Sequence, residues 1–141
     1  MSLLLLDATF LIDAERRGLD LGGWFHTTHL EDAIEDDDDV AIAAVTLAEL
    51  LVGVKLASGK RRAARQAYVN EVVGSVAIIA YDIGVAVEHS ELLATVRKVG
   101  RPSGAHDLLI AATARATHRT IVRADLGAFV DLPGVATIRH R

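Results

Sequence analysis

Short apolar runs recur along the chain, and longer stretches of mixed apolar and polar residues separate them. Most of these runs are apolar throughout instead of alternating, which is typical of strands buried on both faces of a sheet. They predict five β-strands, over Leu3–Leu6, Val40–Val45, Val76–Tyr81, Thr120–Ala124 and Ala136–His140.

The stretches between these runs have helical character. Strands that alternate with helices predict an α/β protein with a doubly wound, mostly parallel sheet. The loop Gly100–Gly104 is too short to link two domains, so we expect a single domain over residues 1–141. The predicted helices are Ala8 to about Arg17, Trp24–Glu35, Thr46–Ala57, Lys60–Val73, Gly84–Val99 and roughly Ala105–His118, with a short turn at Asp125–Phe129.

The amino-acid composition excludes several kinds of functional site. The chain has no cysteine, which excludes thiolate zinc sites, cysteine nucleophiles and disulfide scaffolds. The opening run Leu3–Leu6 is too short for the core of a signal peptide, and no apolar run reaches roughly 18 residues. We therefore expect a soluble, cytoplasmic protein that has no membrane partner.

Four acidic residues fall where parallel strands end. Asp7 follows the first predicted strand, Glu49 lies early in the helix after the second, and Asp125 closes the strand Thr120–Ala124. Asp107 opens a long apolar helix whose start faces the same edge if that helix runs antiparallel to the sheet. Ligands of open α/β sheets bind at this edge, so we expect the four side chains to converge there.

Each acid taken alone also has a structural explanation. Asp7 and Asp107 are typical N-caps, Thr46 with Glu49 forms a capping box, and Asp125 could start a turn. Four converging negative charges, however, repel one another unless they are protonated or neutralised. Oxygen ligands without histidine or cysteine are what Mg²⁺ or Mn²⁺ prefers, so the set predicts a metal site.

The net charge of −4 at first argues against a nucleic-acid partner, because phosphate is usually bound by a basic surface. Setting aside the four acids of the predicted site brings the formal charge to zero, and bound metal would invert the local field. A phosphodiester substrate therefore remains compatible with the composition. A divalent ion could polarise such a bond and activate water.

Four segments resemble the motifs of PIN domains, in the family's order. Leu4–Asp13 resembles the opening motif, Val45–Gly53 the second acidic motif, and His106–Ala114 the third, which is the most specific. Asp125 with the Phe, Leu and Gly that follow it resembles the closing segment. The order, separations and total length are similar to those of the VapC toxins of bacterial VapBC toxin–antitoxin pairs, over essentially the whole chain.

This resemblance implies a PIN-like three-layer α/β/α sandwich with a central five-stranded sheet. It also implies the toxin of a type II toxin–antitoxin system, a Mg²⁺- or Mn²⁺-dependent endoribonuclease that is usually a homodimer and is inhibited by a small VapB-type antitoxin. Its metal-binding and catalytic residues would be Asp7, Glu49, Asp107 and Asp125.

Two positions depart from the family pattern. Arg123 stands two residues before Asp125, where members often have Thr or Ser, and this affects local hydrogen bonding and the second metal position. Ala8 follows the first acid where a hydroxyl residue is common, so Thr9 is carried over only as a candidate supporting contact.

Basic residues near the predicted edge are candidate contacts for RNA phosphates; these are Arg16, Arg17, Lys98 and Arg101. A second basic cluster, Lys55, Lys60, Arg61, Arg62 and Arg65, is more typical of a solvated helix face.

Two other functions compete with the nuclease. An aspartyl-phosphate phosphotransferase or receiver-like protein also has Asp at strand ends, but the chain lacks the second Asp of a DxD start and a Lys after a late strand. A PIN-like binding protein that no longer cleaves is the other alternative, and Arg123 keeps it open.

Overall fold

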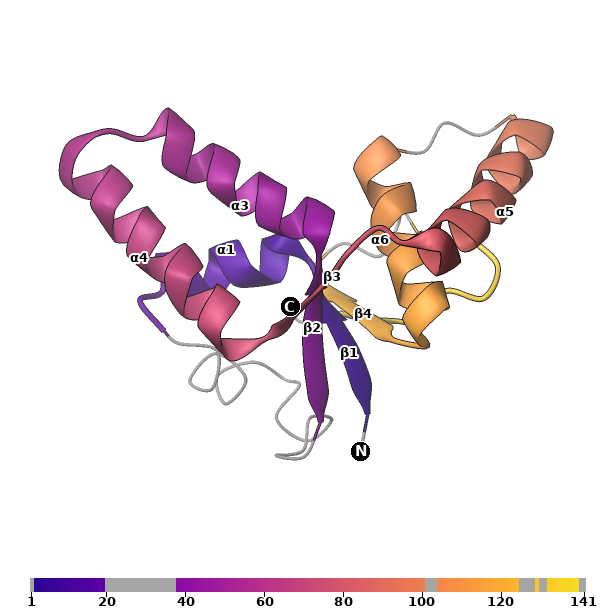
Figure 1. The fold of residues 1–141 in the computed structure, drawn as a ribbon, viewed down its shortest axis with the longest axis horizontal. Coiled ribbons are helices and arrows are strands. Elements are labelled where there is room, and N and C mark those ends of the chain that lie inside the picture. Colours follow the sequence, from indigo (N-terminus) through magenta and orange to yellow (C-terminus); the bar gives the residue numbers. More distant parts are fainter. Residues whose placement is uncertain (1, 20–37, 101–103, 125–128, 130–131, 140–141) are drawn as a thin grey trace.

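A five-stranded parallel sheet forms the centre of the protein, of which the computed structural model describes residues 2–19, 38–100, 104–124, 129 and 132–139. The strands are β1 Leu3–Leu6, β2 Asp39–Ala43, β3 Ala77–Ile79, β4 Thr120–Arg123 and β5 Thr137–Arg139. Their order is β3-β2-β1-β4-β5, and every pairing is parallel. The sheet predicted from the apolar runs is confirmed, with β1 at its centre (Figure 1).

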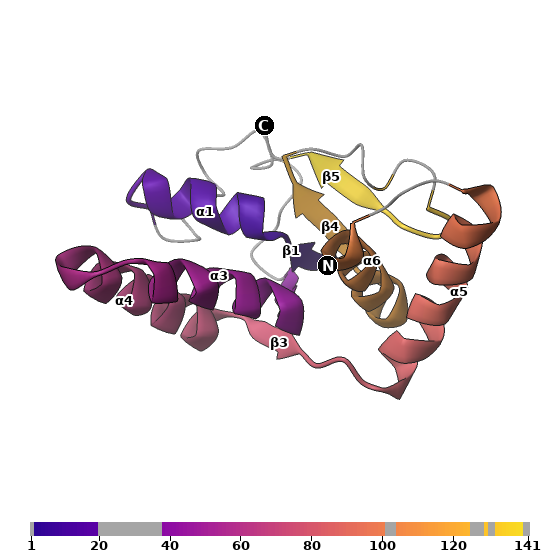
Figure 2. The ribbon, with the colours of Figure 1, turned by 90° about the horizontal axis from the view of Figure 1, so that it is seen from above.

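Helices cover both faces of this sheet, which confirms the three-layer prediction. Figure 2 shows α1, α3 and α4 on one side and α5 and α6 on the other. No helix in the described ranges is long and apolar enough to cross a membrane. The helix predicted over Trp24–Glu35 and all but Phe129 of the turn Asp125–Phe129 lie outside the described residues. The helices are α1 Ala8–Arg16, α3 Ala44–Leu56, α4 Gly59–Ser75, α5 Ile83–Val99 and α6 Ala105–Thr117.

The central strand supplies two separate cores. Leu4 and Leu6 pack with residues of α1, α3 and α4, whereas Leu5 packs with residues of α5 and α6. All three side chains are at most 1% exposed. Alternate residues of a strand point to opposite faces, so an uninterrupted run of leucines serves both layers at once.

The helix α3 begins earlier than the sequence predicts. It starts at Ala44 with Ala43 as its N-cap, so the strand prediction through Val45 is wrong by two residues. The apolar run continues from strand into helix with no polar residue to mark the boundary. Thr46 is therefore buried inside the helix and makes no capping bond, which rules out the predicted capping box with Glu49.

Truncating a central leucine tests the two-core arrangement. Leu5→Ala should lower the free energy of unfolding by about 2–5 kcal/mol, because the side chain is fully buried and the sheet cannot collapse around it. Leu56→Ala is the matched control at an 82% exposed position, where we expect a change within about 0.5 kcal/mol. Urea denaturation of both variants measures the difference, and equal effects would contradict the described burial.

Candidate active site

Asp7 lies where the buried strand β1 passes into α1. It occupies the N-cap position, yet its side chain makes no capping hydrogen bond. Its Oδ2 instead accepts a hydrogen bond from Thr9 Oγ1 at 2.9 Å, and its backbone N–H donates to Val122 of β4 at 3.0 Å. Asp7, a residue that is only 3% exposed, is thus fixed at the carboxyl end of the sheet without serving the helix as a cap.

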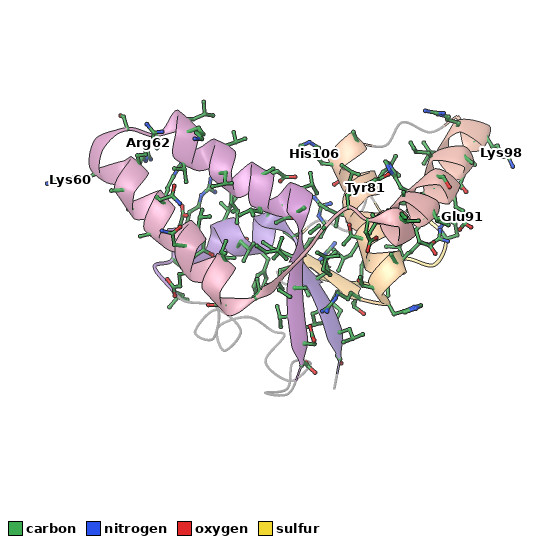
Figure 3. The ribbon with its side chains drawn as sticks, in the orientation of Figure 1. Lys60, Arg62, Tyr81, Glu91, Lys98 and His106 are labelled. Atoms are coloured by element: carbon green, nitrogen blue, oxygen red, sulfur yellow. The ribbon has the colours of Figure 1, made fainter. Side chains whose placement is uncertain are left out.

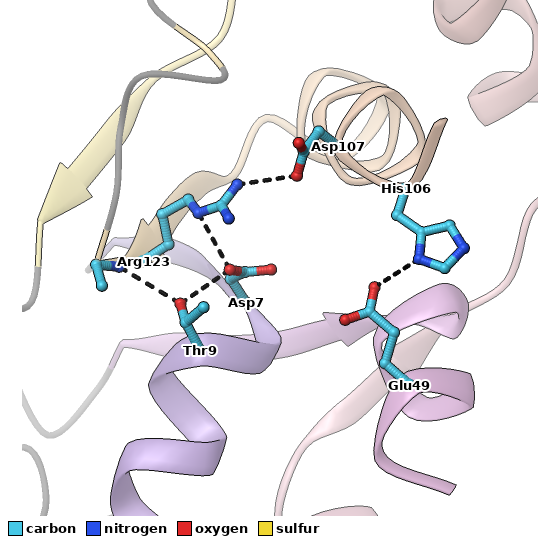
Figure 4. Close-up of polar contacts among 7 residues, drawn as sticks. Asp7, Thr9, Glu49, His106, Asp107 and Arg123 are labelled. Atoms are coloured by element: carbon cyan, nitrogen blue, oxygen red, sulfur yellow. Dashed lines mark hydrogen bonds and ion pairs between the residues drawn. The ribbon is translucent and has the colours of Figure 1, made fainter. Parts of the chain in front are cut away.

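One guanidinium joins Asp7 to Asp107 (Figure 4). Asp107 lies in the first turn of α6, whose N-cap is Gly104. Arg123, the last residue of β4, donates through Nη1 to Asp107 Oδ1 at 2.9 Å and places Nε 3.2 Å from Asp7 Oδ2. The Nε contact is an ion pair without hydrogen-bond geometry. Acids from opposite helix layers therefore share one positive charge.

Glu49 approaches from the second turn of α3 and pairs with His106. Its Oε1 lies 3.0 Å from His106 Nδ1, and its side chain is 30% exposed. Burial raises the pKa of Glu49, and the negative charges of Asp7 and Asp107 raise it further, while His106 acts in the opposite direction. The three acids therefore interact electrostatically across the edge of the sheet.

Most of the predicted acidic set meets at one place. Asp7 at the start of α1, Glu49 in α3 and Asp107 in the first turn of α6 face one another at the sheet edge (Figure 4). The fourth acid, Asp125, lies outside the described residues. Thr9, expected as a supporting contact, bonds Asp7 and also accepts from the backbone N–H of Ala124 at 3.4 Å.

The donor chemistry of this cluster fits a hard divalent cation, because all three acids offer carboxylate oxygens. As placed, no three acidic or histidine side chains of the described residues form a group that could hold a metal. Each carboxylate already has a partner within the chain. Metal would be held by Asp7, Glu49 and Asp107 once those contacts are shared or exchanged.

A basic hollow adjoins Glu49. It encloses about 410 Å³, and its lining includes three arginines and two acids, so its net charge is positive; these are Arg16, Arg61, Arg65, Glu15 and Glu49. Arg16 was expected near the site, but Arg61 and Arg65 belong to the cluster interpreted as a solvated face. Their position on α4 follows from its packing beside α3, which the sequence pattern alone did not indicate.

The other predicted phosphate contacts lie in different places. Arg17 is the C-cap of α1, and Arg101 lies outside the described residues. Lys98 lies in the last turn of α5, and Figure 3 shows it at the end of that helix away from His106. The structure therefore brings Arg16, but not Lys98, to the hollow beside Glu49.

The raised pKa of Glu49 predicts a pH-dependent stability. The folded protein binds the Glu49 proton more tightly than the unfolded chain, so ionisation lowers the free energy of unfolding as pH rises through the folded pKa. Without added metal, Glu49→Gln should match the wild type near about pH 4 and be more stable near about pH 7. Thermal melts across this range measure the divergence.

The control for this test is Glu71→Gln, which removes one charge from an exposed position of α4. Its melting temperature should run parallel to that of the wild type over the same pH range. If Glu49→Gln also ran parallel, the raised pKa assigned to Glu49, caused by burial and by the charges of Asp7 and Asp107, would be wrong.

Comparisons with known proteins agree with this architecture. A family model described as PIN domain matches residues 4–134. No curated protein matches the chain. Among solved structures, VapBC-5 from Mycobacterium tuberculosis, a member of the VapBC family of toxin–antitoxin systems, is 27% identical with a TM-score of 0.74, and the match covers 99% of each chain.

Two further structures share the fold at lower identity. DNA-bound VapBC from Salmonella typhimurium is 21% identical with a TM-score of 0.81, and the match covers 100% of both chains. VapBC2 from Rickettsia felis, bound to a DNA fragment from the promoter, is 22% identical with a TM-score of 0.80, covering 97% of this chain and 98% of the other.

Proposed function

Because the chain belongs to the PIN-domain family, we propose that it is an endoribonuclease that hydrolyses RNA phosphodiester bonds with Mg²⁺ or Mn²⁺. The observation that carries this proposal is the meeting of Asp7, Glu49 and Asp107 at the carboxyl edge of a parallel sheet. Three hard-ligand side chains at the usual ligand-binding edge suit metal-assisted hydrolysis of a phosphate ester. The catalytic unit would be one PIN-like domain spanning residues 1–141.

The proposed roles follow from position. Asp7, Glu49 and Asp107, with Asp125 as the proposed fourth acid, would hold the divalent ion. When bound, that ion would supply positive charge that polarises the phosphodiester and acidifies water. Thr9 fixes the orientation of Asp7 through its hydroxyl.

The basic residues would bind substrate beside these acids. Arg16, Arg61 and Arg65 line the hollow next to Glu49 and exceed its acids in number, although Arg65 also pairs with Glu15 at 3.9 Å. An RNA strand could bind there through its phosphates. Arg17, Lys98 and Arg101 remain proposed contacts for more distant parts of the strand.

The structural relatives support a biological role as a toxin. VapBC-5 from Mycobacterium tuberculosis is described as a member of a toxin–antitoxin family, and it matches this chain end to end. We therefore propose that a small VapB-type antitoxin binds and inhibits the protein, that the protein forms a homodimer, and that it acts in the cytoplasm. A short open reading frame next to the gene, whose product suppresses cleavage when co-purified, would support this pairing.

Removing one ligand charge tests the nuclease. The purified protein should cleave RNA with Mg²⁺ or Mn²⁺, and EDTA should stop the reaction. Asp107→Asn should lower the rate by at least about 100-fold, because the amide keeps the shape but not the charge of the carboxylate. Asp82→Asn is the matched control, since Asp82 caps α5 through Val85 N–H and Asn caps as well as Asp.

Two outcomes would contradict the proposal. Cleavage that persists in EDTA would exclude the metal mechanism. Full activity of Asp107→Asn would show that Asp107 has a structural role and not a catalytic one. A folded protein that binds RNA but never cleaves it would favour the non-catalytic binding protein.

Adjacent arginines test the basic hollow. Arg61 lines the hollow, whereas its neighbour Arg62 does not and lies on the exposed corner between α3 and α4 (Figure 3). Arg61→Ala should raise KM for RNA about three- to tenfold with little change in kcat, because a lost phosphate contact weakens binding. Arg62→Ala should leave KM within about twofold. Equal changes of KM in the two variants would show that RNA does not bind in the hollow.

A further inference from the structure

Arg123 is a permanent cation built into the acidic cluster. Its guanidinium lies between two carboxylates, with Nη1 2.9 Å from Asp107 Oδ1 and Nε 3.2 Å from Asp7 Oδ2 (Figure 4). The side chain is 14% exposed, and that of Asp7 is 5% exposed. The guanidinium therefore brings one positive charge between these two acids.

Packing fixes the guanidinium at this place. Its central carbon lies 5.0 Å from the centre of the Phe129 ring, a distance that allows a cation–π interaction. Arg123 is the last residue of β4, and its backbone pairs with Arg139 of β5. The side chain is therefore attached to a strand of the sheet and not to a loop. The contacts on both sides of the guanidinium therefore restrict where it can move.

The contacts of Arg123 leave one side of the cluster available. Asp7 Oδ2 accepts the hydrogen bond from Thr9 and forms the ion pair with Arg123. The other oxygen of Asp7 takes part in neither contact and points toward Glu49 (Figure 4). Glu49 is not in contact with Arg123 and pairs with His106. An ion beside Asp7 and Glu49 would thus meet carboxylate oxygens that the guanidinium does not occupy.

Competition for carboxylate oxygens points the same way. A second ion between Asp7 and Asp107 would need the oxygens that Arg123 already contacts and would stand beside a like charge. The guanidinium and a second metal ion are therefore alternatives.

We propose that Arg123 takes the place of a second metal ion, so that the acidic cluster binds a single divalent cation. This inference rests on the proposed metal-dependent function and specifies its stoichiometry. Arg123 acts as a positioning residue that holds Asp7 and Asp107 at a fixed separation. Its positive charge replaces that of a second metal between Asp7 and Asp107.

Counting bound Mn²⁺ tests the inference without reference to cleavage. Mn²⁺ titration of the full chain, followed by the electron paramagnetic resonance signal of free Mn²⁺, should give one ion per wild-type chain at saturation. Arg123→Met keeps an apolar stem for Phe129 but removes the charge. It should bind two ions, or bind the first at least about tenfold more tightly, because the competing charge is gone.

Two further variants separate charge from structure. Arg123→Lys retains a positive charge and should keep the count at one. Arg139→Met removes the charge of the paired residue on β5, which is exposed, and should also leave the count and affinity unchanged. Without metal, Arg123→Met should melt at a lower temperature than the wild type, and Mn²⁺ should restore part of the loss, because the metal then supplies the missing counter-charge.

The outcomes distinguish this inference from the proposed function. Two ions on the wild-type chain would overturn the role of Arg123 and leave the metal-dependent nuclease standing; this count remains decisive even if Arg123→Met does not fold. One ion on both wild type and Arg123→Met, at equal affinity, would also overturn it. No bound ion on a folded wild-type chain would overturn both proposals together.

Discussion

Repulsion between carboxylates at one end of a parallel sheet is the constraint on which this site depends. Asp7 follows β1 and is almost fully buried. The helices α3 and α6 begin near it, so Glu49 and Asp107 lie beside Asp7. A charge removed from water is stable only with a partner of opposite sign or strong hydrogen bonds. Each acid has one: a hydroxyl and a guanidinium for Asp7, the same guanidinium for Asp107, and an imidazole for Glu49.

The division of charge around the site is compatible with the proposed RNA substrate, although the protein as a whole is acidic. Negative side chains are concentrated at the sheet edge, while Arg16, Arg61 and Arg65 line the hollow next to it. Net charge therefore says little about a local surface, because fields from exposed groups fade within about 10 Å at ordinary ionic strength. The proposed RNA substrate would meet arginines and acids together in that hollow, with positive charge in excess.

Much of this arrangement was predictable from the sequence, because it depends on local pattern. Uninterrupted apolar runs predicted the parallel sheet, and the acids that follow those runs predicted which edge of the sheet carries the site. The order of the motifs predicted the PIN family, which the match over residues 4–134 confirms. The start of α3 was not predictable, since no polar residue separates it from β2. Pairings such as Glu49 with His106, 57 positions apart, arise from tertiary packing and leave no periodic signal.

The bridge from Asp7 through Arg123 to Asp107 has a mechanical consequence. Asp7 stands at the start of α1, on one face of the sheet, and Asp107 at the start of α6, on the other. The same few atoms that would perform chemistry therefore clamp two layers whose apolar cores are separate clusters. A substitution of Arg123 would therefore change the charge of the site and remove a contact between the two layers at the same time.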